Sequence, residues 1–392
     1  MLQMLSSSLL SLCRRSLLPS RALVSKLNTS AAPGTEQDLV VDYLEEEDHG
    51  IVVFGINRPK AMNALSKNLV TNLSSAIDAV KFDKNCRVVI IRSLAKGAFC
   101  AGADLKERAK MTPAEVGPFV AKGREIIGAW DKLPMPVIAA IDGVALGGGL
   151  EMALACDLRV ASDNAKLGLT ETRLAIIPGG GGTQRLPALT GVPNTLDMAL
   201  TGKTVNAKKA KKLGLVDAVV DPLGPGLAPQ DVTTHKYLEN IAINTAKQLG
   251  SGTMKLPNRS PKNFSKKAEN FAFGVGQVKD YVFNMAKGKV MKQTNGLYPA
   301  PLKILEVLRA GLDGGPEAGY KAEREKFGEL VATSESKGLI SLFNGQTECK
   351  KNKFGKPSNP SKTLGVLGAG LMGAGIAQVG IMILTELILM NR

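Results

Sequence analysis

The first part of the chain alternates short hydrophobic runs with segments in which hydrophobic residues recur at helical spacing. The runs 51–57, 87–92 and 137–141 are rich in β-branched residues and predict strands. Between the first two runs, the helical spacing of residues 69–80 follows Ser66, which suits a helix N-cap, and predicts a helix.

Two further helices are predicted around the third run. One starts at Pro113 and ends near Lys132, and the other is opened by Gly147–Gly149 and continues through Ala155. This repeated order of strand and helix predicts an α/β fold with a parallel sheet and right-handed crossovers.

The pattern changes in the second half of the chain. From about Leu200 it becomes helical and Lys-rich, and Pro/Gly-rich or polar connectors lie at 221–229 and 350–362. Residues 363–367 then predict a strand that enters a GxGxxG turn, which is typical of dinucleotide binding; its glycines are Gly368, Gly370 and Gly373. The apolar stretch 365–390 is Gly-rich and contains Glu386, so we interpret it as part of a truncated core rather than a membrane helix.

The N-terminal 35 residues have the composition of a targeting segment. They are rich in Leu and Ser, contain Arg14, Arg15, Arg21 and Lys26, and have no acidic residue before Glu36. This pattern predicts a cleaved mitochondrial transit peptide and a location in the mitochondrial matrix, with a disordered tail or a secretory signal as the alternatives. The five scattered cysteines include no CxxC pair, which agrees with a reducing compartment.

The formal charge of +15 is concentrated in two stretches. The leader contributes +4 and residues 251–300 contribute +7, which together account for 11 of the 15 charges. The basic stretch could face nucleic acid, an anionic lipid surface or ligand phosphates, but it could equally be a solvated surface, because it lacks interleaved aromatic residues that stack on bases. With only two histidines, His49 and His235, a His-rich metal site and a Ser-His-Asp triad are both disfavoured, and no metal is expected.

Glycines and acidic residues in the middle of the chain suggest the chemistry. Glycines 147–149 let backbone N–H groups at a helix N-terminus approach a ligand, and a second donor could come from the loop around Ala103. Glu151 and Glu171 are carboxylates in apolar surroundings, where burial is costly without a task or a partner. Together they could hold a water molecule as an acid and base pair, although a single Glu at a helix start could also serve only as a cap.

Three segments, 99–106, 138–155 and 167–185, resemble the motifs of the crotonase (enoyl-CoA hydratase/isomerase) superfamily, and the resemblance covers about Glu45 to Leu186. It implies a crotonase-type ββα spiral core with C-terminal helices. It also implies that hydration of an acyl-CoA substrate needs no cofactor, since CoA is part of the substrate. The positions it assigns are Glu151 and Glu171 as catalytic residues, Ala103 and Gly148 as oxyanion-hole donors, and Lys60, Ala101 and Asp104 as CoA contacts.

Two branches of relatives are recognisable within this resemblance. Residues 99–108 and 146–157 are most similar to the methylglutaconyl-CoA hydratase family, which is also described as binding AU-rich RNA. From about Gly191 the chain resembles the α subunit of the mitochondrial trifunctional protein, and the GxGxxG turn matches the start of its NAD domain. Because the chain stops after the first βα unit, we expect a truncated Rossmann βα fragment, an incomplete NAD motif and no dehydrogenase activity.

These interpretations divide the chain and rank its functions. The predicted parts are a transit peptide, a crotonase core, a helical C-terminal or linker region, a linker and an incomplete NAD-binding fragment, at 1–35, 36–225, 226–350, 351–362 and 363–392. The leading hypothesis is a hydratase of 2-enoyl-CoA thioesters in fatty-acid β-oxidation or branched-chain amino-acid breakdown. The alternatives are an RNA-binding protein, disfavoured by Thr71, Asn72 and Ser75 on the polar side of the helix that is Lys-rich in the relative, and an inactive scaffold.

The resemblance also implies partners. Members of the superfamily are commonly trimers or paired trimers, so a homo-oligomer is expected, or assembly with a thiolase-type β subunit. Peripheral contact with the inner mitochondrial membrane is a further possibility that the basic stretch leaves open.

Overall fold

A computed structural model describes residues 37–224, 228–257, 273–351, 359, 363–368, 370–381 and 386–390. The predicted transit peptide and residues 258–272 of the basic stretch lie outside these residues. The chain comprises two units, Met1–Ser341 and Leu342–Arg392, which we describe separately. The five-part domain division given above stays a prediction.

The first unit is built on a six-stranded sheet with the order β1-β2-β3-β5-β7-β10. Every neighbouring pair is parallel except β1 and β2, which are antiparallel because a short turn joins them. The strands predicted at 51–57, 87–92 and 137–141 are confirmed as β2, β3 and β5. The strands are β1 (Leu39–Tyr43), β2 (Ile51–Ile56), β3 (Val88–Ser93), β5 (Val137–Ile141), β7 (Leu158–Ser162) and β10 (Ala218–Val220).

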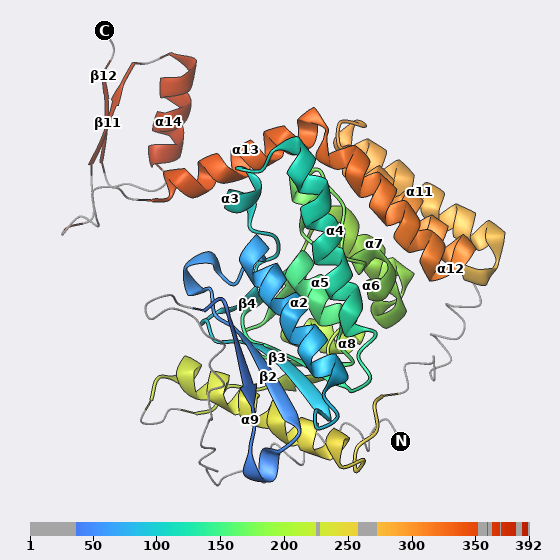
Figure 1. Cartoon of the computed structure of the whole chain (residues 1–392). Coiled ribbons are helices and arrows are strands. Elements are labelled where there is room, and N and C mark those ends of the chain that lie inside the picture. Colours follow the sequence, from blue (N-terminus) through green and yellow to red (C-terminus); the bar gives the residue numbers. More distant parts are fainter. Residues whose placement is uncertain are drawn as a thin grey trace. The chain divides into compact units, whose positions relative to one another are not determined.

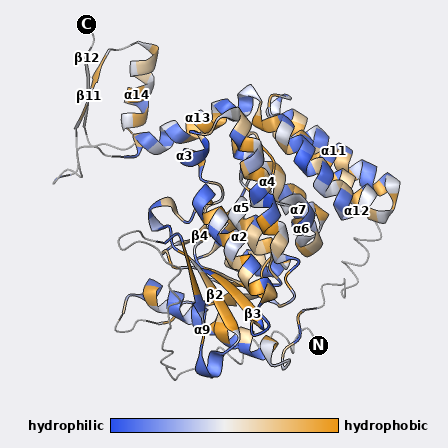
Figure 2. Ribbon diagram, viewed as in Figure 1, coloured by the Kyte–Doolittle hydropathy of each residue, from blue (hydrophilic) through white to orange (hydrophobic). Residues whose placement is uncertain are grey.

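Both faces of this sheet are buried. Along β2, Val52 and Phe54 point into the larger hydrophobic core, while Ile51 and Val53 point to the opposite face, which is covered by α9 (Gln230–Gly250) (Figure 1). Burial on two faces explains why β2 and the first four residues of β3 are continuous hydrophobic runs without alternation. Figure 2 shows these two strands as mainly hydrophobic.

A second sheet has four short strands in the order β4-β6-β8-β9. Along the chain, its first three strands alternate with long strands of the first sheet. Each of β3, β5 and β7 is followed by a short strand of this sheet and then by helical structure, which is the ββα repeat that the resemblance implied. The strands are β4 (Ala98–Cys100), β6 (Val144–Leu146), β8 (Lys166–Gly168) and β9 (Val205–Asn206). With two or three residues each, they are too short for hydrophobic periodicity to predict.

Helices complete the first unit. The predicted cap is confirmed, because the Ser66 hydroxyl accepts a hydrogen bond of 3.1 Å from Leu69 N at the start of α2. The described helices are α2 (Lys67–Phe82), α3 (Leu105–Arg108), α4 (Pro113–Trp130), α5 (Gly148–Ala155), α6 (Gly182–Thr190), α7 (Val192–Thr201), α8 (Ala207–Leu213), α9, α11 (Gly276–Thr294) and α12 (Pro299–Val331). The short 3-10 helices are η1 (Glu46–Asp48), η2 (Pro59–Ala61) and η3 (Glu171–Leu174). In Figure 1, α11 and α12 lie side by side.

The second unit follows α13 (Ser334–Cys349), which crosses the boundary between the two units. It contains β11 (Thr363–Leu367), α14 (Leu371–Ile381) and β12 (Glu386–Met390), and β12 pairs parallel with β11. The expectation of one strand and one helix start is therefore wrong in one respect. The apolar end of the chain is a second strand, because it has an edge of β11 to pair with.

Candidate active site

The N-terminus of α5 meets the loop that follows β4. A Cβ placed on Gly149 would lie 2.2 Å from the carbonyl oxygen of Cys100, so the helix packs directly on the strand. A Cβ on Gly102 would lie 3.5 Å from the nitrogen of Gly148. Gly148 is the first residue of α5, where an N–H group has no acceptor within the helix, so this N–H is available at the junction.

The backbone around Ala103 is fixed by a parallel bridge to Leu65. Leu65 N donates to Gly102 O at 2.8 Å, and Asp104 N donates to Leu65 O at 3.1 Å. Successive N–H groups of an extended chain point to opposite sides, so the N–H of Ala103 points away from Leu65. The structure thus brings the loop of Ala103 next to Gly148, the two positions predicted to form an oxyanion hole.

Glu151 lies in the first turn of α5, and its side chain is buried, with 3% of the residue exposed. Its Oε1 accepts hydrogen bonds from Gly180 N at 2.7 Å and from Gly182 N at 2.8 Å. Burial raises the pKa of Glu151, while these two N–H groups and the nearby Arg185 and Arg124 act in the opposite direction. The hydrogen bonds therefore favour the carboxylate form of this residue.

Glu171 begins the 3-10 helix η3 and approaches the same glycines from another side. A Cβ on Gly147 would lie 3.0 Å from Glu171 Oε1, and a Cβ on Gly148 would lie 4.0 Å from Glu151 Oε2. Within the described chain, neither Glu171 oxygen accepts a hydrogen bond from another residue. Burial, and then the charge of Glu151, raise the pKa of Glu171 well above its usual value, so this residue keeps its proton more readily than Glu151.

A third buried acid, Glu323 of α12, was missed by sequence reasoning. It is fully buried and accepts hydrogen bonds from Gly181 N at 2.8 Å and from the backbone and hydroxyl of Thr183. Burial, and then the charge of Glu151, raise the pKa of Glu323 to about 7. The sequence did carry a sign of it, because Glu323 shares one helical face with Tyr320, Phe327 and Leu330.

The remaining predicted residues are spread more widely. Lys60 is exposed on η2, and Ala101 N donates to Met62 O at 3.1 Å. Asp104 caps α3 and forms an ion pair of 3.1 Å with Arg58, so its carboxylate already has partners. CoA contacts by these residues stay predictions.

The predicted dinucleotide turn lies in the second unit. A Cβ on Gly373 would lie 1.7 Å from the carbonyl oxygen of Gly368, and Gly368 has a φ of +100°. Glycine at these positions is therefore required by the turn itself, and the role of Gly368, Gly370 and Gly373 in holding NAD stays a prediction.

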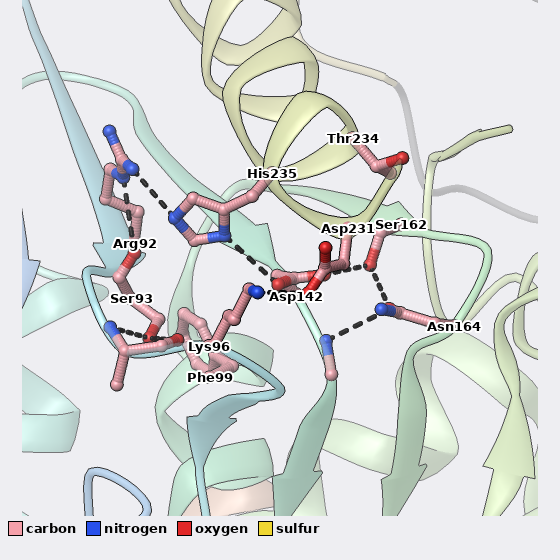
Figure 3. A network of polar contacts seen from close by, with 12 residues as sticks. Arg92, Ser93, Lys96, Phe99, Asp142, Ser162, Asn164, Asp231, Thr234 and His235 are labelled. Atoms are coloured by element: carbon pink, nitrogen blue, oxygen red, sulfur yellow. Dashed lines mark hydrogen bonds and ion pairs between the residues drawn. The ribbon is translucent and has the colours of Figure 1, made fainter. Parts of the chain in front are cut away.

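A second polar cluster lies on the other face of the main sheet, under α9 (Figure 3). His235 contacts Asp142 Oδ2 at 3.0 Å and Arg92 Nη2 at 2.9 Å, and Ser162 Oγ donates to Asp142 Oδ1 at 2.8 Å. Ser162 therefore meets Asp142 and not the imidazole, so the cluster lacks the serine–histidine contact of a nucleophilic triad. Its bonds instead join α9 to β3 and to the end of β5.

The residues that the structure describes include no group of three or more His, Cys, Asp or Glu side chains arranged to hold a metal ion. None of the helices described is long and apolar enough to cross a membrane.

Comparison with known proteins identifies a matching family and individual relatives. The pattern of the Enoyl-CoA hydratase/isomerase family matches residues 46–271. Mitochondrial methylglutaconyl-CoA hydratase of Homo sapiens is 57% identical over 196 residues, covering 50% of this chain and 58% of that protein. The fatty acid oxidation complex subunit alpha of Vibrio vulnificus (strain CMCP6) is 40% identical over 345 residues, covering 86% of this chain and 46% of that protein.

The solved structures agree with this likeness. The crystal structure of an enoyl-CoA hydratase from Bacillus anthracis has a TM-score of 0.50 and 32% sequence identity, covering 79% of this chain and 97% of that chain. The chain thus spans nearly all of a single hydratase but only about half the length of the curated relatives.

Proposed function

Because the chain belongs to the enoyl-CoA hydratase/isomerase family, we propose that it adds water across the 2,3-double bond of 2-enoyl-CoA thioesters. The observation that carries this proposal is the pair of buried carboxylates, Glu151 and Glu171, in unlike environments at the N-terminus of α5. One accepts two backbone N–H groups and the other accepts none from another residue of the described chain, so they suit the roles of base and acid.

The chemistry follows from these positions. The thioester oxygen accepts hydrogen bonds from the N–H groups of Ala103 and Gly148, which draws electrons from the conjugated double bond and leaves C3 electrophilic. Glu151 takes a proton from water as the water oxygen bonds to C3. Glu171 gives its proton to C2, so one molecule of water is added overall. The proton on Glu151 then returns to Glu171 before the next turnover.

The acyl-CoA substrate brings its own CoA group to the site. CoA is the carrier of the acyl group, and this chemistry uses no further cofactor. We assign the CoA contacts to Lys60, Ala101 and Asp104, with exposed Lys60 available to meet a phosphate. The dinucleotide turn of Gly368, Gly370 and Gly373 takes no part in hydration.

The cellular setting is part of the same proposal. The human relative is named as mitochondrial and the Vibrio relative as a subunit of a fatty acid oxidation complex, and the leader composition agrees with import into the matrix. We therefore place the reaction in fatty-acid β-oxidation or branched-chain amino-acid breakdown in the mitochondrial matrix. The protein acts there as a homo-oligomer or with a thiolase-type subunit.

A substrate panel tests the proposal. The full chain is assayed on crotonyl-CoA, a long-chain 2-enoyl-CoA and 3-methylglutaconyl-CoA, and the 3-hydroxyacyl product is identified by mass. Hydration of at least one thioester is expected, with loss of activity in the Glu151→Gln, Glu171→Gln double variant. Absence of hydration with all three substrates in folded protein would contradict the proposal.

A further inference from the structure

The loop from Gly179 to Thr183 is held by two carboxylates that take alternate N–H groups. Gly180 N and Gly182 N donate to Glu151 Oε1 at 2.7 and 2.8 Å. The intervening donors, Gly181 N and Thr183 N, bond to Glu323 at 2.8 and 3.3 Å. Four consecutive peptide N–H groups at the start of α6 are thus divided between an acid of α5 and an acid of α12, with each acid taking every second one.

Two carbonyl groups of the loop are bound by arginines. Arg124 Nε donates to Gly179 O at 2.7 Å, and Arg185 Nη1 donates to Gly180 O at 2.7 Å. The peptide groups that join residues 179 to 180 and 180 to 181 therefore have an arginine at the oxygen and a carboxylate at the nitrogen. Room for a side chain is absent on the carboxylate side, because a Cβ on Gly180 would lie 2.8 Å from Glu151 Oε2.

From this arrangement we propose that Glu323 is a positioning residue for hydration, which fixes the loop so that Gly180 and Gly182 present both N–H groups to Glu151. The inference rests on the proposed hydratase function. Without the Glu323 carboxylate, Gly181 N and Thr183 N would lose their acceptor in a buried site. The loop would then turn these groups toward another acceptor, such as Glu151, which already binds the neighbouring N–H groups of Gly180 and Gly182.

Glu323 also acts on the acid side of the reaction through its charge. Burial, Glu151 and then Glu323 raise the pKa of Glu171, the proposed proton donor. The other groups that face this site are Arg124 of α4, Arg185 of α6 and Tyr320 of α12. Removal of the negative charge of Glu323 should therefore lower the pH at which Glu171 loses its proton.

The test compares Glu323→Gln with Glu325→Gln, a change on the exposed face of the same helix. With crotonyl-CoA, Glu323→Gln is expected to lower kcat about 10- to 100-fold while KM changes less than about twofold. The alkaline limb of its kcat profile should move to lower pH. The Glu325→Gln control should keep wild-type kcat, KM and pH profile.

A second variant keeps the inference testable if Glu323→Gln fails to fold. Thr183→Val removes the hydroxyl that donates to Glu323 and accepts from Gln184 Nε2, while the backbone N–H of residue 183 keeps its bond to Glu323. About a threefold loss of kcat is expected. Wild-type kcat and an unmoved pH profile in the folded variants would overturn the inference and leave the proposed function standing. The same holds if thermal stability falls while the kcat of folded protein is kept. A wild-type chain that hydrates no thioester contradicts the proposed function itself, which is a separate result.

Discussion

The carboxylate cluster of Glu151, Glu171 and Glu323 buries acidic side chains, and so does the network of Asp142, His235 and Arg92 under α9. The two regions balance the charge of their acids in opposite ways. In the network, burial alone would raise the pKa of Asp142, yet hydrogen bonds with His235 and Ser162 outweigh it and hold that pKa below its usual range. Arg92 joins the same network and also pairs with Glu239. In the carboxylate cluster, Glu171 has no such partner among the residues that the structure describes, and its pKa rises.

The difference separates groups that hold the fold from groups that are kept for chemistry. A fully paired acid stabilises the native state, because its charged form is better satisfied there than in water. An acid left without partners is held in place by its surroundings at a cost in stability, and such sites are candidates for function. Substitutions in the two regions should therefore affect different measurements.

The largest effect on activity is expected from two acids of the carboxylate cluster. Glu151→Gln and Glu171→Gln should each lower kcat for crotonyl-CoA hydration by about 10²–10⁴, because each removes a proton donor or acceptor without changing side-chain volume. Thermal unfolding should show that the fold is intact. Near-normal turnover in either variant would mean that its role is assigned wrongly.

A smaller loss of activity is expected when an oxyanion donor is removed. Gly148→Pro takes away the N–H at the first position of α5, where proline is tolerated in helices, so kcat should fall by about 10²–10³. Gly148→Ala is the control, since it keeps the N–H, and its Cβ would lie 3.2 Å from the Leu65 side chain and 4.0 Å from Glu151 Oε2. If the melting temperature falls in step with activity for the proline variant alone, Gly148 is structural rather than an oxyanion donor.

The network should respond in stability and not in catalysis. Asp142→Asn removes the charge that bonds with His235, so the free energy of unfolding in urea should fall by about 2 kcal/mol, while kcat of the folded protein stays within about twofold. Asp231→Asn is the control, because the exposed ion pair of Asp231 with Lys96 should contribute nothing measurable. A large loss of kcat in folded Asp142→Asn would remove the distinction between the two regions.

The smallest effect is a difference in pH dependence. Because the folded-state pKa of Glu171 is raised, its ionisation destabilises the native state as pH rises above about 4.5, and Glu171→Gln should gain on wild type in that range. The folded-state pKa of Asp142 is lowered, so its contribution is present above about pH 4 and is lost as pH falls. Each slope is at most about 1.4 kcal/mol per pH unit. Urea unfolding from about pH 2 to pH 8 covers both windows, because the Asp142 slope lies below about pH 4 and the Glu171 slope lies above about pH 4.5. Parallel slopes for the two variants would contradict the opposed pKa shifts.

Much of the core and the main motif could be predicted because the information lies in contiguous segments. Residues 147–151 carry the glycines, the helix start and one acid together, and β2, β3 and β5 are long enough for their composition to identify them. The short strands β4, β6 and β8 carry too few residues for any period. The strand β12 was missed because its pairing with β11 is a tertiary event.

The environment of the acids could not be predicted in the same way. Glu323 reaches Thr183 across 140 residues of sequence, and no local pattern reports such a contact. The polar network likewise joins Arg92 to His235 across 143 residues. The sequence identified Glu151 and Glu171, but only the fold shows Glu323 and the N–H groups and arginines that surround these acids.

The same separation orders events during synthesis. At about 5–20 residues per second, Gly181 and Thr183 leave the ribosome roughly 7–28 s before Glu323 follows them. During that interval, the N–H groups of Gly181 and Thr183 can bond only to water, because the carboxylate of Glu323 is not yet in place at the start of α6. We therefore expect the amides of Gly181 and Thr183 to exchange hydrogen rapidly in nascent chains stalled before α12 and slowly in the finished protein. Hydration would then begin only after α12 docks, and a chain interrupted before α12 would fold its six-stranded and four-stranded sheets without being active.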